Sequence, residues 1–267
     1  VDAGVKASSQ DEVTVGVESI DPTVAGVKAK NESAVAQMLA AVTKAGVAGK
    51  DVQTEFVYLD DVQFDKHGWR NRNRIKGPAG PQWLTVPVRV SGLLQPEIRD
   101  VLVDPTQPRW PSKHLQALRT NYGTCPFFTW LFPELEAVLL RPWTHVAHLD
   151  IATTEVLCRK LGLARPLHRS SELGAPPGRC ERLVAFCQIL NCNHYYSGAA
   201  AKDYLDEELF TRAGISVEFQ SYQHPVYPQH YGEFASHLSV VDLLFNCGPR
   251  SLEVLTGAAA RPTGISA

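Results

Sequence analysis

Residues 55–76, EFVYLDDVQFDKHGWRNRNRIK, join a short apolar and aromatic run to a dense group of charges. The run EFVYL has the length and composition of a strand that is covered on both faces, as in parallel sheets. Polar residues after such a strand lie at the carboxyl edge of the sheet, where α/β proteins bind their ligands. We therefore predict a three-layer α/β fold with a largely parallel sheet, and a helical insertion near residues 108–163.

Two adjacent carboxylates, Asp60 and Asp61, follow this strand directly. Either one could meet a substrate as a general base, a metal ligand or the acceptor of an amine. The structural alternative is that Asp60 caps a turn and Asp61 pairs with a nearby arginine. Because adjacent strand residues point to opposite faces, we expect at most one of the two carboxylates to serve a site.

Cations recur at every second position of GWRNRNRIK, at Arg70, Arg72, Arg74 and Lys76. In an extended chain these side chains share one face. Guanidinium groups bind phosphate and carboxylate oxygens with paired hydrogen bonds, which predicts a site for the diphosphate of a sugar nucleotide or lipid-linked sugar. The alternative is a solvated edge strand whose charges prevent aggregation. The same loop adds charge and aromatic faces from Lys66, His67 and Trp69.

The residue pattern of 192–222 predicts a strand, a turn, a helix, a second turn and a second strand. Ser197 and Gly198 form the first turn, and we expect a helix near Ala199 whose free amides bind an anion. Ser197 serves equally well as the N-cap of that helix, and the two roles are compatible. Further substrate contacts are expected from Tyr196 and Lys202.

The loop after the next predicted strand carries several histidines between prolines that limit its freedom. Histidine titrates near neutral pH, so His224 or His230 is expected to exchange protons with an amine. A structural role is the alternative for each histidine taken singly. Asp242 is either a carboxylate at the start of the following helix or the orienting partner of a loop histidine. Substrate contacts are predicted for Tyr227, Gln229 and Asp242.

Composition limits the classes of function. The 267 residues carry 26 Lys and Arg against 28 Asp and Glu, a net charge of −2 that argues against a general DNA-binding protein. No apolar run approaches the roughly 20 residues that cross a bilayer, and the first residues do not resemble a signal peptide, so a cytoplasmic location is expected. The 6 cysteines include no Cys-x-x-Cys pair, which favours buried thiols over a metal site. We identify no cofactor.

The chain before residue 56 differs in composition, being rich in Ala and Val and low in aromatic residues. It predicts a strand at 12–20, a helix at 21–46 and a second strand. The stretch VTVGVESIDPTVAGVKAKNESAVAQMLAAVTKAGVAGKDVQTE resembles the first quarter of a SIMPL domain. We interpret residues 1–56 as a scaffold segment.

Residues 57–267 form the second predicted unit and, with the strand before it, resemble the WbqC-like family. The motifs that carry the resemblance are FVYLDDVQFDKHGWRNRNRIK, QWLTVPV, YYSGAAAKDYL, GISVEFQSYQHPVYPQ and FASHLSVVDLLFNCG. This resemblance implies a role in bacterial O-antigen, lipopolysaccharide or other surface-polysaccharide biosynthesis. It also implies a transferase that moves a glycyl or other aminoacyl group to an amino sugar.

This sequence departs from the family at its start. The family opens with a strand, a Gln-Pro-x-Tyr-x-Pro-like turn and a Gly-Tyr-Phe helix, and this sequence has a SIMPL-like strand and helix instead. We expect residues 12–20 to lie beside residues 55–60 and complete the sheet.

Three functional interpretations are open. The first is a transferase that uses a phosphate-bearing sugar and an aminoacyl donor. The second is a non-catalytic glycan-binding protein or inactive fusion. The third is RNA contact through the arginines, if the donor is a charged tRNA.

Overall fold

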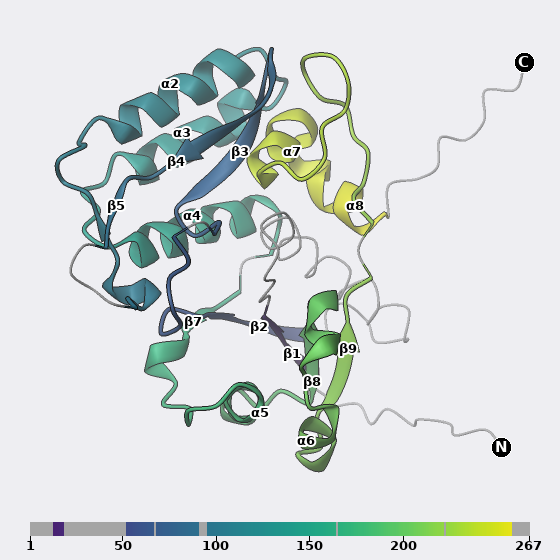
Figure 1. Cartoon of the computed structure of the whole chain (residues 1–267). Coiled ribbons are helices and arrows are strands. Elements are labelled where there is room, and N and C mark those ends of the chain that lie inside the picture. The colour runs from purple at the N-terminus through teal and green to yellow at the C-terminus, as the bar shows by residue number, and fades with distance from the viewer. Residues whose placement is uncertain are drawn as a thin grey trace, which may run out of the picture.

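The computed structural model describes residues 13–18, 52–66, 68–90, 95–163, 165–221 and 223–257. Five parallel strands form the main sheet in the order β7-β2-β1-β8-β9 (Figure 1). Their bounds are β1 (Val13–Glu18), β2 (Val52–Tyr58), β7 (Leu167–Arg169), β8 (His194–Ser197) and β9 (Ser216–Phe219). Two antiparallel pairs lie outside it: β3 (Arg72–Gly77) with β4 (Gly80–Thr85), and β5 (Val88–Arg89) with β6 (Leu102–Val103).

The strand order of the main sheet is that of a doubly wound α/β protein. The chain runs from β1 outward to β2 and β7, and then returns to the other side of β1 to form β8 and β9. In such sheets the ligand site lies beyond the carboxyl ends of the strands, where the order reverses, which here is between β1 and β8. The predicted α/β class is confirmed, while its three layers stay a prediction.

The predicted pairing of the N-terminal strand with the strand before the acid pair is confirmed. β1 lies parallel to β2, with Val13 opposite Val52 and Gly16 opposite Glu55. On its other side β1 pairs with β8, so it occupies the centre of the sheet. The helix predicted at 21–46 lies outside the described residues, and the SIMPL resemblance stays a prediction. A boundary at residue 56 falls inside β2, and the division into two units also stays a prediction.

All the α-helices of the described residues follow β6 in the chain. The insertion expected near residues 108–163 consists of three helices between β6 and β7: α2 (Trp110–Tyr122), α3 (Phe128–Leu139) and α4 (Val146–Lys160). Pro111 lies in the first turn of α2, where its missing N–H leaves no hydrogen bond unmade. The later helices are α5 (Cys180–Ile189), α6 (Glu207–Arg212), α7 (Val240–Cys247) and α8 (Ser251–Thr256). Single 3₁₀ turns are η2 (Ile98–Asp100), η3 (Ser170–Glu172), η4 (Ala199–Asp203) and η5 (Gly248–Arg250).

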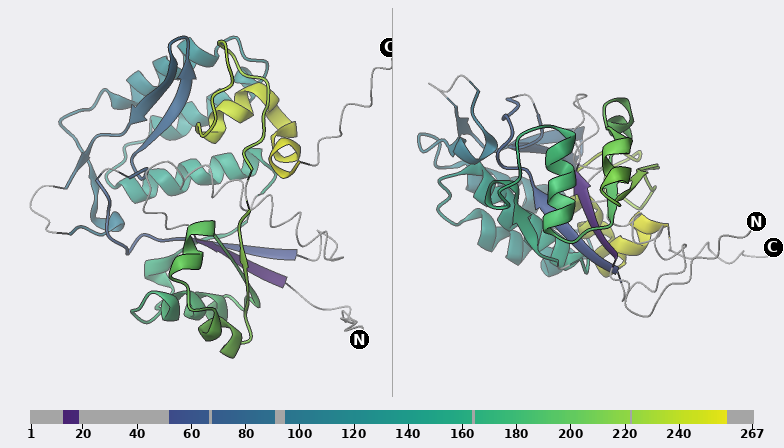
Figure 2. Two further views of the ribbon diagram at one scale, coloured as in Figure 1. Left: turned by 45° about the vertical axis from the view of Figure 1, so that its right-hand side comes forward. Right: turned by 90° about the horizontal axis from the view of Figure 1, so that it is seen from below.

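The two faces of the sheet contribute to different apolar clusters. Tyr195 packs with residues of α5 and α6, whereas the adjacent Tyr196 packs with residues of α2, α3, α4 and α7. Neighbouring strand residues point to opposite faces, so one tyrosine supplies each cluster. Both views in Figure 2 agree with this arrangement, in which α5 and α6 lie across the sheet from α4. The thiols of five cysteines are buried and that of Cys158 is half-buried, which confirms the predicted burial.

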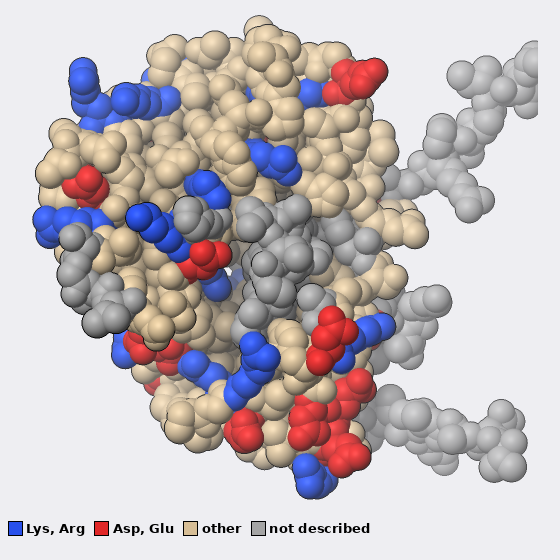
Figure 3. All heavy atoms as spheres, viewed as in Figure 1, with Lys and Arg blue, Asp and Glu red and all other residues tan. Residues whose placement is uncertain are grey.

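The surface carries charges of both signs. Figure 3 shows basic and acidic side chains interspersed over one face, with acidic ones gathered around α6, whose first turn holds Glu207 and Glu208. Within the described part of the chain, no helix has both the length and the apolar content to cross a membrane.

Candidate functional site

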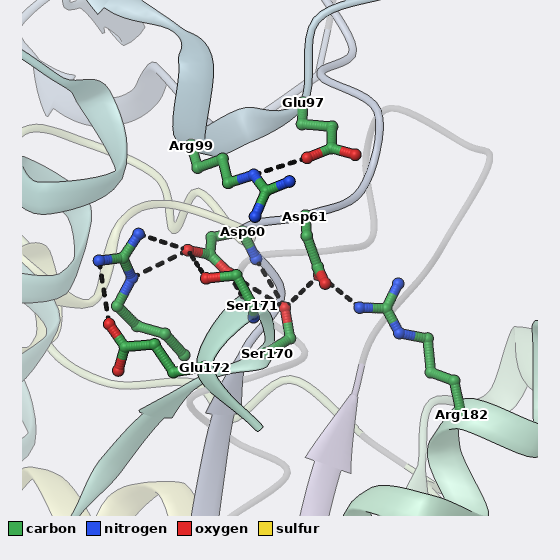
Figure 4. Close-up of polar contacts among 9 residues, drawn as sticks. Asp60, Asp61, Glu97, Arg99, Ser170, Ser171, Glu172 and Arg182 are labelled. Carbon is green, nitrogen blue, oxygen red and sulfur yellow. Dashed lines mark hydrogen bonds and ion pairs between the residues drawn. The ribbon is translucent and has the colours of Figure 1, made fainter. Parts of the chain in front are cut away.

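The first predicted site element is the acid pair that follows β2. Asp60 is fully buried, and Nε and Nη2 of Arg169 donate to its Oδ2 over 2.8 and 2.6 Å (Figure 4). The backbone N–H of Ser171 donates to Asp60 Oδ1 over 3.0 Å, and the Ser171 hydroxyl donates to Oδ2 over 2.8 Å. Both oxygens of Asp60 therefore hold the β7–η3 segment against the end of β2.

Asp61 forms a second link to the same segment. Its Oδ1 accepts hydrogen bonds from Ser170 Oγ and from Nη2 of Arg182 on α5. Ser170 Oγ also lies 3.1 Å from Asp60 Oδ1, so both carboxylates converge on one hydroxyl. The prediction that they point to opposite faces is wrong, because β2 ends at Tyr58 and strand alternation no longer applies beyond it.

The surroundings of Asp60 lower its pKa. Burial is the largest single effect and raises the pKa, but hydrogen bonds from Ser171 and from the Arg169 guanidinium outweigh it. A carboxylate held ionised in this way is a weak base. The geometry matches the structural alternative, in which Asp60 caps a turn, here η3, and Asp61 pairs with an arginine. Catalytic roles for Asp60 and Asp61 stay predictions.

The second element is the β3–β4 hairpin, where two guanidinium groups stack on two indole rings. The Arg72 guanidinium carbon lies 4.6 Å from the Trp83 ring centroid. The Arg74 guanidinium lies 5.6 Å from Trp69 and 5.7 Å from Trp83, and the two indoles are 4.8 Å apart. Trp83 remains 43% exposed. We call Trp69, Arg72, Arg74 and Trp83 the arginine–tryptophan surface.

The cationic stripe is shorter than predicted. Arg70 precedes β3 and lies 5.7 Å from the ring centroid of Tyr58 instead. Lys76 lies at the buried end of β3, and its Nζ donates to Gln229 Oε1 over 3.1 Å and to the carbonyl of Glu233. Of the predicted stripe, only Arg72 and Arg74 therefore lie together on the half-buried part of β3, because this strand runs into the core. Lys66 is exposed, and His67 lies outside the described residues.

Lys76 belongs to a buried polar network centred on Asp242. The carboxylate of Asp242 is fully buried and accepts hydrogen bonds from Tyr122 over 2.8 Å, Tyr227 over 2.9 Å and Gln229 Nε2 over 2.8 Å. Burial is the main effect on the pKa of Asp242 and raises it. The predicted orienting role toward a loop histidine is wrong, because two tyrosines and a glutamine occupy both of its oxygens.

The histidine loop meets the hairpin at His237. Nη2 of Arg74 donates to the carbonyl of His237 over 3.0 Å, and His237 adopts a left-handed φ of 58°. Its ring lies 5.2 Å from that of His224, whose Nδ1 lies 2.8 Å from the carbonyl of Pro225. Burial lowers the pKa of His224 and keeps it neutral at pH 7. Of the predicted set, the structure thus brings together Trp69, Arg72 and Arg74, and His224 is linked to them through His237.

His230 occupies a different position in the same loop. It contacts Thr124 and Cys125 in the turn between α2 and α3, and Asn246 on α7. Sequence reasoning included neither Trp83 nor His237 in the site. The signal for Trp83 is an aromatic residue opposite Arg74 in a hairpin, which requires the strand register. The signal for His237 is a histidine shortly before a helix.

The turn after β8 differs from prediction. Tyr196 and Ser197 are buried, and the helix expected near Ala199 is the five-residue 3₁₀ helix η4, which lacks the α-helical amides of an anion site. Gly198, not Ser197, precedes η4. The α-helix starts at Glu207, where Asp206 caps it by accepting from the backbone N–H of Leu209. Lys202 lies over the ring of Phe219.

Metal ligands are not grouped at these positions. Among the residues that the structure describes, no group of three His, Cys, Asp or Glu side chains could hold a metal ion.

Comparison with known proteins identifies the relatives of this chain. The WbqC-like protein family matches residues 50–254. The chain belongs to this family. The uncharacterized protein Rv1507c of Mycobacterium tuberculosis (strain ATCC 25618 / H37Rv) is 36% identical to this WbqC-like protein over 203 residues, which cover 75% of this chain and 87% of the relative. No solved structure shows a significant match. The family match includes the acid pair, hairpin and histidine loop of this WbqC-like protein, but it begins after β1.

Proposed function

We propose that this WbqC-like protein is a transferase of bacterial surface-polysaccharide synthesis that binds a phosphate-bearing sugar on its arginine–tryptophan surface. Membership of the family supports the assignment to this pathway. The observation that carries the proposal is the position of Arg74, which stacks on two indoles and contacts the histidine loop through His237.

Arg74 is suited to an anionic ligand. Its Nε is buried and has no hydrogen-bond partner among the described residues, and none of their carboxylates forms a salt bridge with it. The charge of Arg74 is therefore not neutralised by a described carboxylate, and such a guanidinium is suited to bind a phosphate oxygen through its other N–H groups. The exposed ring of Trp83 offers an apolar face to the sugar, whose C–H groups pack well on indoles.

His224 supplies the acid–base chemistry in this proposal. With Nδ1–H donating to the carbonyl of Pro225, the neutral ring carries its lone pair on Nε2. Because burial lowers its pKa, the imidazole can accept a proton from an attacking amine at neutral pH. The reaction is then transfer of an aminoacyl group to an amino sugar.

A non-catalytic glycan-binding protein is the second candidate. The acid pair favours it, because Asp60 and Asp61 are both engaged by arginines and serines in contacts that stabilise the fold.

Titration calorimetry with UDP-linked and dTDP-linked amino sugars tests the proposal. Arg74→Ala and Trp83→Ala should each weaken binding by about tenfold or more, equivalent to about 1.4 kcal/mol. Arg119→Ala is the matched control, because Arg119 also stacks on an aromatic ring, that of Phe132 at 4.7 Å, and should leave binding unchanged. Binding without turnover of an aminoacyl donor supports the second candidate. Absence of binding by the wild-type protein refutes both.

A further inference from the structure

A second group of reactive side chains lies at the turn between α2 and α3. Cys125 Sγ is 3.3 Å from His230 Nδ1 and 3.8 Å from His230 Nε2. Asn246 Oδ1 is 3.3 Å from His230 Nδ1 and 3.7 Å from Cys125 Sγ. Thr124 is exposed, and His230 and Asn246 are half-buried, so the sulfur lies just beneath the surface. We call Cys125, His230 and Asn246 the Cys–His–Asn cluster.

Hydrogen bonds assign the protons of this cluster. Asn246 Nδ2 donates to the carbonyl of Asp242 over 2.8 Å, which leaves Oδ1, a pure acceptor, facing the imidazole. Nδ1 of His230 must then carry the proton, and Nε2 holds the lone pair, 3.2 Å from Thr124 Oγ1. A thiol beside an imidazole that a third group orients is the arrangement of an activated nucleophile.

The backbone around His230 is held in an unusual conformation. The preceding residue, Gln229, is bound by Lys76 and Asp242 in the buried network. The following residue, Tyr231, has a left-handed φ of 62°, which is rare for a bulky side chain. Such backbone strain is concentrated at functional sites and persists only where the surrounding contacts impose it. The buried network therefore fixes the imidazole beside the thiol.

The resting thiol needs a neighbouring base. Burial, and next the charge of Asp242, raise the pKa of Cys125 to about 12, so the thiol is protonated at neutral pH. Cys247 offers a direct comparison within the same apolar cluster. It is buried to the same degree, 4% exposed against 5%, but it forms no hydrogen bond to a described histidine.

We propose that Cys125 is a nucleophile that accepts an acyl group from an activated ester, with His230 as its base and Asn246 as a positioning residue. The S–H proton passes to Nε2 of His230, which holds the lone pair 3.8 Å from Sγ, as Sγ attacks the ester carbonyl carbon. The C–O bond then breaks, and the leaving oxygen takes that proton. An amine attacks the resulting thioester, the C–S bond breaks, and the amine proton returns to Sγ. This inference deepens the proposed transferase function and rests on it for the acceptor amine.

Acetylation by 4-nitrophenyl acetate tests the nucleophile without any sugar. The full-length native protein should release one equivalent of 4-nitrophenolate in a burst, and peptide mass spectrometry should locate one hydroxylamine-sensitive acetyl group on Cys125. Cys247→Ser should retain this labelling, and Cys125→Ser should lose it. His230→Gln should slow the labelling by about a hundredfold, the typical contribution of a general base.

The position of Asn246 is tested by two variants of that residue. Asn246→Ala should slow acetylation, and Asn246→Asp, which keeps an acceptor oxygen, should restore it. A merely structural role predicts no such rescue.

The proposal is refuted if native Cys125 is acetylated no faster than Cys247, or if His230→Gln reacts like the wild type. The second comparison holds even if Cys125→Ser does not fold. Acetylation needs no sugar, so the wild-type protein is compared in this assay and in the calorimetric sugar titration. Absence of sugar binding together with normal Cys125 acetylation refutes the proposed sugar site alone, and the reverse result refutes the nucleophile alone.

Discussion

Arg74 Nη2 and the carbonyl oxygen of His237 are 3.0 Å apart, although 163 residues separate them in the chain. This hydrogen bond joins the β3–β4 hairpin to the loop before α7. It holds the guanidinium over the rings of Trp69 and Trp83 and against the backbone of the histidine loop. The carbonyl orients Arg74, and the stacked rings limit its rotation, so its remaining N–H groups have a defined direction.

Arg74→Lys should weaken the binding of a sugar nucleotide by about tenfold, although the charge is kept. A lysine offers no planar fork for a phosphate and stacks less well on Trp69 and Trp83. Calorimetry at two salt concentrations measures the effect. The opposite result, equal affinity of the lysine variant, would show that the position contributes only a point charge.

Asp242→Leu should lower the free energy of unfolding by about 3–5 kcal/mol, because it removes the acceptor of two tyrosine hydroxyls and the carboxylate whose charge acts on buried Lys76. Asp242→Asn keeps one acceptor oxygen and the side-chain volume, so its loss should be smaller. Urea denaturation compares the two variants. Equal losses would indicate that packing, and not hydrogen bonding, determines the contribution of Asp242.

Asp60→Asn should destabilise the fold by about 3 kcal/mol at pH 7, since Arg169 loses a buried charged partner. Asp61→Asn is the matched control, because its side chain is 20% exposed and its pair with Arg182 is partly solvated. For Asp61→Asn we expect about 1 kcal/mol.

The contribution of Asp60 should also depend on pH. Its pKa in the folded protein lies below its value in the unfolded chain, so the stabilisation is complete above the unfolded value of about 3.9 and is lost as pH falls through the folded pKa. The difference in unfolding free energy between wild type and Asp60→Asn should therefore shrink below about pH 4. A constant difference between pH 7 and pH 3 would contradict the ionised state assigned to Asp60.

Val15→Pro should unfold or strongly destabilise the protein, because β1 pairs on both sides and proline lacks the backbone N–H that a central strand needs at each position. An unpaired buried carbonyl costs about 1–3 kcal/mol. Val15→Ala keeps the N–H and serves as the control. Circular dichroism and thermal melting give the comparison. Similar melting of the proline and alanine variants would place β1 outside the cooperative unit.

The strands and helices that the sequence predicts correctly are those whose local residue pattern is enough to define the type of element. The apolar run before Asp60 identified a covered strand, and the valines at 13–17 identified its neighbour. The helix expected after Gly198 is not an α-helix. Asp206 supplies a better cap eight residues later, so the α-helix begins there and the intervening chain forms η4. Local propensity indicated a helix there but did not determine its start.

The sequence by itself determined the α/β class, the pairing of β1 with β2 and the location of charged groups at strand ends, because periodicity and composition act over a few residues. Only the tertiary structure decided which charges remain available. It directs Asp60 to Arg169 and Lys76 to Gln229, keeps Arg74 beside the histidine loop, and brings Cys125 next to His230. These contacts join residues that lie 105 to 163 positions apart in the chain. Burial and strand register, which no local pattern encodes, select the partner of each group.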